Sequence, residues 1–165
     1  MLTDAIRLVL FPALMAFAAS SDLFTMTISN RVTFVLVVGF LVLAIFSGMP
    51  AHDMLAHAGA AVAVLAVTFT FFACGWIGGG DAKLAAATAL WFGFDHLVAY
   101  ALYASIFGGI LTIAMIRFRL MPLPPVLAEQ EWLKRLHKVD GGVPYGIALA
   151  AAALLIYPHT SWMQL

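Results

Sequence analysis

Long apolar segments separated by short loops constrain this chain more than any other feature. Six such segments can be read from the sequence, at residues 5–23, 32–46, 55–74, 82–94, 97–116 and 143–157. A helix needs about 20 residues, at about 1.5 Å each, to cross the hydrocarbon core of a bilayer. Because 64% of the residues are hydrophobic and only 10% are charged, the bilayer is the expected solvent. The pattern predicts an all-α polytopic membrane protein, a bundle of six transmembrane helices forming one domain over residues 1–165.

The fourth segment is shorter than the others. Only eleven uncharged residues lie between Lys83 and Asp95, which is about 17 Å of helix. If this helix crosses the membrane, one of its ends must lie below the membrane surface. Asp81 is at one of those ends.

The basic residues predict the orientation in the membrane. Lys and Arg occur at positions 7, 31, 83, 117, 119, 134, 135 and 138. With six crossings, all of them except Arg7 fall on one side. The positive-inside rule then makes the loops at 20–31, 75–83 and 117–142 cytoplasmic and places both termini outside.

Composition also excludes several kinds of partner. The net charge is zero, which argues against binding to nucleic acid. A single cysteine, Cys74, excludes a disulfide framework and a cysteine zinc site. The histidines have no metal-ligand spacing, so we expect no metal and no cofactor. The partner that composition does predict is the lipid bilayer.

Two acids are the candidate chemical groups, because both lie at the predicted cytoplasmic ends of apolar helices. Asp22 follows Ser20 and Ser21, and Asp81 follows three glycines, Gly78, Gly79 and Gly80. Considered singly, each acid has a purely structural interpretation: Asp81 as the N-cap of a helix, and Asp22 as the polar end of the first helix. Together they fit that reading less well, because ionisable residues near membrane depth are energetically costly and usually functional.

The same pair suggests a reaction. Two carboxylates a few ångströms apart tend to share one proton. The ionised one can take a proton from water while the protonated one polarises a carbonyl, which is aspartic-protease chemistry. Because glycine permits close approach of another backbone, we expect a peptide cleft between the first and fourth helices, floored by residues 78–80.

Three motifs resemble one family. Asp22-Leu23-x-Thr25-x-x-Ile28-x-Asn30 looks like the first conserved block of the type IV prepilin peptidases, especially the short form that serves Flp/Tad pili. Gly78-Gly79-Gly80-Asp81-Ala82-Lys83-Leu84 resembles the second block, whose Gly-x-Gly-Asp core is shared with presenilin-like proteases. Val143-Pro144-Tyr145-Gly146 is similar to a further family feature.

The resemblance implies an aspartic-type endopeptidase of the bacterial inner membrane that removes prepilin or pseudopilin leader peptides at the cytoplasmic face. It assigns Asp22 and Asp81 as the catalytic pair, with Gly78, Gly79, Gly80, Lys83 and Asn30 shaping the site or binding substrate. The cytosolic insert that longer members use for N-methylation is missing, so we expect cleavage without methylation.

Several alternatives stay open on the sequence. Lys83 either marks the cytoplasmic side or steers an acidic substrate residue, and Asn30 either caps the second helix or lies near the site. Residues 126–138 read as an interfacial amphipathic helix, which has a second reading as a docking element for substrate. Trp76, Trp91 and Trp162 read as interfacial anchors. The competing functions are a small proton- or cation-coupled transporter subunit using the same acids, and a structural subunit of a secretion assembly.

Overall fold

The structure is a computed structural model, and it describes residues 2–124 and 127–163. Every regular element in these residues is helical, which confirms the all-α class. The α-helices are α1 (Leu2–Thr25), α2 (Asn30–Phe46), α3 (Ala51–Ala73), α4 (Gly79–Leu120), α5 (Glu131–His137) and α6 (Tyr145–Ile156), with short 3-10 turns η1 (Leu127–Glu129) and η2 (Tyr157–His159).

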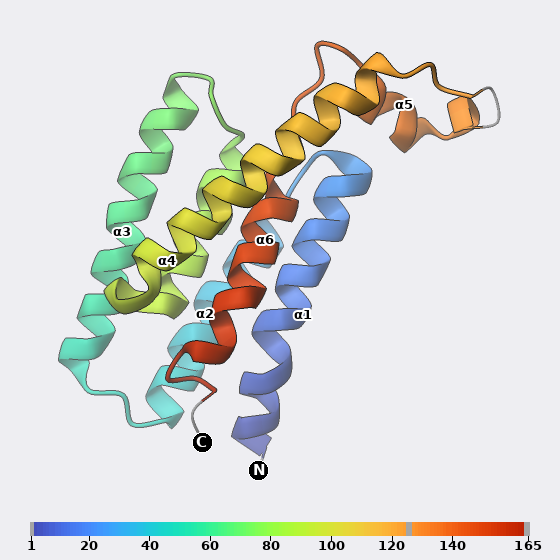
Figure 1. Ribbon diagram of the computed structural model, residues 1–165. Coiled ribbons are helices and arrows are strands. Elements are labelled where there is room, and N and C mark those ends of the chain that lie inside the picture. Colours follow the sequence, from blue (N-terminus) through green and yellow to red (C-terminus); the bar gives the residue numbers. More distant parts are fainter. Residues whose placement is uncertain (1, 125–126, 164–165) are drawn as a thin grey trace.

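The helices have the length and composition of a multi-pass membrane protein. Ile6–Thr25, Ala51–Ala73 and Gly79–Leu120 are each long and apolar enough to cross a bilayer, and Asn30–Phe46 and Tyr145–His159 are shorter apolar helices. The chain runs back and forth along the bundle, so that the amino and carboxyl ends lie at the same end of it (Figure 1).

Helix α4 is two helical arms joined at a sharp break. Gly93, at the break, has φ 62° and ψ −168°, which lies outside the helical region. The chain turns back there, and the second arm, residues 94–120, runs toward α5 (Figure 1). The two predicted segments 82–94 and 97–116 are these arms. Nδ1 of His57 in α3 lies 2.7 Å from the carbonyl oxygen of Leu90 and donates to it just before the break.

An aromatic cluster forms the core between α1, α2, the first arm of α4 and the end of the chain. Phe11 stacks on Tyr157 with ring centroids 4.4 Å apart, and the Trp91 ring lies 5.2 Å from that of Trp162. The prediction that Trp91 and Trp162 are interfacial anchors is wrong, since both are buried. Burial is possible because each indole N–H has an internal acceptor, the carbonyls of Leu36 and Trp91.

Helix α6 packs against both α1 and α4 at the centre of the bundle. Its buried side chains are mostly alanines, and the first arm of α4 also buries several alanines. Small residues let helix backbones approach closely where apolar side chains give no advantage over lipid. Helix α3 lies at the outside of the bundle against α4, and Ala60 is the one side chain that it buries. Its exposed phenylalanines therefore face the surroundings of the bundle.

The segment between α4 and α6, which contains α5, folds over one end of the bundle. We call this end the carboxylate end, and it comprises the C-terminal ends of α1 and α3, the N-terminal end of α4, and α5. Arg135 in α5 donates to the carbonyl of Phe24 at 2.9 Å, and Arg119 donates to the carbonyl of Leu136 at 2.9 Å. The predicted amphipathic segment corresponds to η1 and α5, although its first residue, Val126, lies outside the described residues.

The break in α4 gives a first prediction. A Cβ at Gly93 would lie 3.1 Å from Cε1 of His57, and positive φ strains any L side chain. We expect Gly93→Ala to destabilise the protein by about 1–3 kcal/mol in thermal unfolding in detergent. Gly109→Ala is the matched control, because a Cβ there meets nothing within 4 Å. Equal melting temperatures for the two variants would contradict the assigned backbone conformation.

Candidate functional site

Asp22 is held in the interior by the start of α6. It lies one turn before the C-terminus of α1 and is only 5% exposed. Its Oδ2 accepts a hydrogen bond of 2.7 Å from the backbone N–H of Gly146, the second residue of α6. The first N–H groups of a helix have no partner within the helix and carry a partial positive charge. The carboxylate of Asp22 therefore satisfies one of these donors, and the donor compensates for its burial.

Asp81 occupies a similar position at the start of α4. Gly78 is the N-cap residue, and its N–H donates to Oδ2 of Asp81 at 3.3 Å, as in a capping box. The alternative reading of Asp81 as the N-cap itself is thus wrong. Asp81 is half-buried, and its carboxylate interacts electrostatically with that of Asp22. Two acids 59 positions apart in sequence are therefore near enough to interact, Asp22 facing the N-terminus of α6 and Asp81 lying in the first turn of α4.

Two glycines allow this approach by packing against one side chain, Ile28. A Cβ at Gly80 would lie 3.2 Å from Cβ of Ile28. A Cβ at Gly146 would lie 2.8 Å from Cδ1 of Ile28 and also 2.8 Å from Oδ2 of Asp22. Real Cβ atoms essentially never come as close as 2.8 Å, so a side chain at Gly146 would force its neighbours to shift, and at Gly80 Ile28 would have to move by a few tenths of an ångström. The starts of α4 and α6 therefore pack most closely on Ile28 with glycine at both positions.

The residues of the first motif fold back on themselves beside Asp22. Ser21 donates its hydroxyl to the carbonyl of Thr27 at 2.9 Å, and the hydroxyls of Thr25 and Thr27 are 2.7 Å apart. Met26 between them has φ 56°, which ends α1 and turns the chain. Because of this tight turn, Ile28 packs against the starts of α4 and α6 although it follows Asp22 closely in the sequence.

The other predicted site residues lie around the pair rather than between the acids. Lys83 donates to Oδ1 of Asn30 at 3.0 Å, which joins the starts of α2 and α4 at an exposed rim. Ser29, not Asn30, is the N-cap of α2, so the cap reading of Asn30 is wrong. A Cβ at Gly79 would lie 3.3 Å from the Phe72 ring, which places that glycine against the end of α3.

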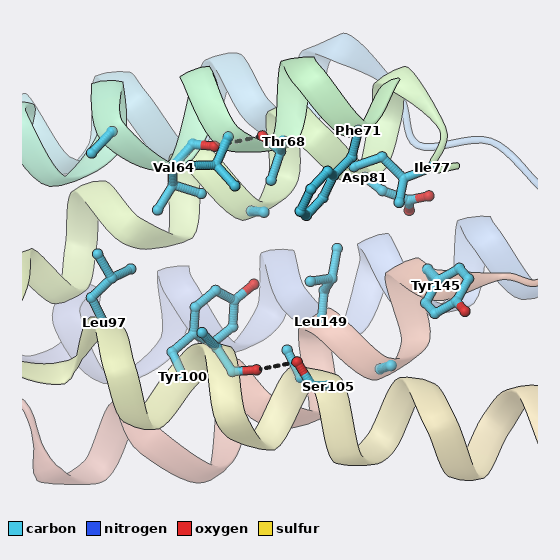
Figure 2. Close-up of a pocket in the computed structure, with 16 residues that line it drawn as sticks. Val64, Thr68, Phe71, Ile77, Asp81, Leu97, Tyr100, Ser105, Tyr145 and Leu149 are labelled. Atoms are coloured by element: carbon cyan, nitrogen blue, oxygen red, sulfur yellow. Dashed lines mark hydrogen bonds between the residues drawn. The ribbon is translucent and has the colours of Figure 1, made fainter. Parts of the chain in front are cut away.

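A pocket of about 440 Å³ opens beside Asp81 (Figure 2). Its lining comes from α3, both arms of α4 and α6, and includes Val64, Thr68, Phe71, Asp81, Tyr100 and Leu149. The pocket therefore does not lie in the expected place, between the first and fourth helices, because α1 and the first arm of α4 pack directly on each other through Phe11 and Trp91, whose ring centroids are 5.1 Å apart. None of the glycines 78–80 lines this pocket, so they shape the site through helix packing and capping.

The sequence indicated the two acids as candidate site residues, but it did not indicate which residues hold them in place. Gly146 belongs to a motif that the sequence singled out without a role, and Ile28 belongs to the first motif. The signal was the Pro-Tyr-Gly at the start of an apolar helix, since a glycine inside the first turn permits another group to approach its N–H. In the described part of the chain, no three His, Cys, Asp or Glu side chains are grouped as metal ligands would be.

Comparison with known proteins identifies the family. Residues 9–113 match the model of the type IV leader peptidase family. This range includes both aspartates and ends before α6. No curated protein and no solved structure gives a significant match to the chain.

The contact between Gly146 and Asp22 gives a second prediction. We expect Gly146→Ala to destabilise the protein by about 1–3 kcal/mol, because the new methyl group overlaps Asp22 and Ile28 in a packed site. The measurement is thermal unfolding of the detergent-solubilised protein. In the control, Gly142→Ala, the new Cβ would make only an ordinary contact of 3.7 Å with Met26. A Gly146→Ala protein as stable as this control would show that the start of α6 does not hold Asp22 tightly.

Proposed function

We propose that this chain, which belongs to the type IV leader peptidase family, is an aspartic endopeptidase with Asp22 and Asp81 as its catalytic pair. We propose further that it removes the leader peptides of Flp/Tad-type prepilins at the cytoplasmic face of the bacterial inner membrane. Family membership supports a prepilin peptidase function. The observation that supports the assignment of residues is geometric: each carboxylate accepts a hydrogen bond from a backbone N–H at the start of a helix, and both helix starts pack against Ile28.

This arrangement supports acid–base catalysis by the pair. Two neighbouring carboxylates at the same charge repel each other, and retaining one proton between them relieves that repulsion. The ionised member removes a proton from water, the water oxygen attacks the scissile carbonyl carbon, and the protonated member polarises the carbonyl oxygen. As the C–N bond breaks, a carboxyl proton passes to the leaving amine. The N–H groups of Gly78 and Gly146 orient the two carboxylates for these transfers.

The proposed membrane arrangement has six crossings, made by α1, α2, α3, the two arms of α4, and α6. The basic residues at the carboxylate end include Lys83, Arg119 and Arg135, and they support a cytoplasmic position for that end. The first arm of α4, residues 79–92, is about 20 Å long, which is less than the thickness of the hydrocarbon core. With Asp81 near the cytoplasmic face, the turn at Gly93 would lie within the membrane.

The proposal of cleavage without N-methylation rests on the short connections at the carboxylate end. Only residues 26–29 join α1 to α2, and residues 74–78 join α3 to α4. Neither leaves room for a folded insert. A short prepilin peptidase of the Flp/Tad type fits these connections.

Substitution of the two acids is the direct test. We expect Asp22→Asn and Asp81→Asn each to reduce leader removal by at least about a thousandfold, because each loses a proton-transfer group of one reacting pair. The measurement is co-expression with a tagged Flp-type prepilin in cells that lack other prepilin peptidases, with cleavage followed by gel shift.

Asp53→Asn and Asp95→Asn are matched controls. These acids line a separate pocket around His57 and Gly93, away from the carboxylate end, and should leave cleavage unchanged. All variants must reach equal membrane levels. Full cleavage by an Asp22 or Asp81 variant would reject the assigned pair. Absence of cleavage by the wild type would favour the transporter or scaffold function.

The proposed orientation has its own test, because the natural Cys74 is free and exposed at the end of α3. We expect a membrane-impermeant maleimide to label Cys74 in inverted inner-membrane vesicles and not in spheroplasts. A Cys74→Ser, His52→Cys variant should give the reverse pattern, since His52 is exposed at the opposite end of α3. The same labelling pattern for both cysteines would contradict the assigned topology.

A further inference from the structure

The pocket beside Asp81 contains a buried hydroxyl that has no hydrogen-bond partner, that of Tyr100. Tyr100 lies on the second arm of α4 and is only 3% exposed. Its hydroxyl oxygen is buried and unpaired. Thr88 lies next to it, but the Thr88 hydroxyl donates to the carbonyl of Leu84 at 2.9 Å and is not at hydrogen-bonding geometry with Tyr100. A buried hydroxyl left unpaired is unfavourable, so its presence requires an explanation.

The other hydroxyls that line this pocket are already engaged. Thr68 donates to the carbonyl of Val64 at 2.7 Å, and Ser105 donates to the carbonyl of Ala101 at 2.7 Å. The hydroxyl of Tyr145 lies 2.9 Å from that of Thr112 and is hydrogen-bonded to it. Tyr100 is therefore distinguished from these residues by a donor that is free for a molecule in the pocket.

The Tyr100 side chain is held in place by its ring and not by its hydroxyl. The ring meets that of Phe92 edge to face, with centroids 5.3 Å apart. Figure 2 shows the hydroxyl pointing along the pocket toward the end where Asp81 lies. Tyr100 and Asp81 both line this one pocket. The hydroxyl oxygen is thus held in position before any ligand binds, and its O–H can turn toward an acceptor in the pocket.

We propose that the Tyr100 hydroxyl binds the peptide substrate, by donating a hydrogen bond to a backbone carbonyl close to the scissile bond. This inference rests on the proposed function. A peptide whose scissile bond lies at Asp81 must be extended there, and its carbonyls then lose their helical partners in an apolar pocket. Successive residues of an extended chain advance by about 3.3–3.6 Å, so carbonyls follow one another along the pocket wall. A lipid acyl chain would have no acceptor for the hydroxyl.

The lining of the pocket fits the remainder of such a peptide. Apart from Asp81 and the hydroxyl-bearing residues, it is made of aliphatic and aromatic side chains, with alanine at 63, 85, 101, 104 and 148. Small side chains leave room for the apolar side chains of a ligand. The pocket therefore binds a peptide with apolar residues beside the cleaved bond, and Tyr100 fixes the position of its backbone.

The test is Tyr100→Phe, which keeps the ring contact with Phe92 and removes only the unpaired hydroxyl. With the purified protein in detergent and a Flp-type prepilin, we expect KM to rise about tenfold, the effect of one lost hydrogen bond to a buried carbonyl. We expect kcat to stay within about threefold and the melting temperature to be unchanged or higher, because no partner within the protein is lost. Tyr103→Phe is the control: Tyr103 is on the same arm but exposed and outside the pocket, and it should leave KM unchanged.

Binding measured without turnover separates this inference from the proposed function. In an Asp81→Asn background, adding Tyr100→Phe should weaken binding of the same prepilin about tenfold. An unchanged KM and Kd would overturn the inference, and a lipid acyl chain would then be the assigned occupant of the pocket. A loss confined to kcat would overturn the binding role, and a lowered melting temperature would show that the hydroxyl has a structural partner instead. Absence of cleavage by the wild type would reject the proposed function, and the binding comparison would still decide the role of Tyr100.

Discussion

The hydrogen bond from Gly146 to Asp22 is the interaction on which the rest of the site depends. A carboxylate with 5% exposure is tolerated in an apolar bundle only when a donor compensates for its lost hydration. The first turn of α6 supplies that donor at 2.7 Å. The same contact fixes the start of α6 against α1, and with Ile28 it determines how closely the start of α4 can approach Asp22.

The break at Gly93 is the second determinant, because it sets what faces the acids. A continuous α4 would carry Tyr100 away from Asp81 along one axis. The turn returns the chain, so that the second arm, α3 and α6 enclose a pocket in which Asp81 and Tyr100 are both part of the lining. The bond from His57 to the Leu90 carbonyl supports this turn from α3. Backbone conformation at one glycine thus decides which side chains line the pocket beside Asp81.

Much of the fold was predictable because it follows from solvation. Apolar segments predicted helices, and the predicted segments 82–94 and 97–116 correspond to the two arms of α4. The misassignments concern side chains with a polar atom on an apolar body. The sequence around Trp91 and Trp162 is compatible with either an interfacial or a buried position. Burial is possible only because the carbonyls of Leu36 and Trp91, which are distant in the chain, accept hydrogen bonds from the two indole N–H groups.

The sequence by itself determined the all-helical class, the apolar segments and the two acids with their glycine neighbours, because these depend on composition and on local spacing. The tertiary structure alone decided that α6 packs against both α1 and α4, that Gly146 binds Asp22, and that the pocket lies beside Asp81 and not between the first and fourth helices. The physical reason is that helix packing depends on complementary shapes of residues far apart in the chain. A glycine that admits a carboxylate looks the same in sequence as one that merely ends a turn.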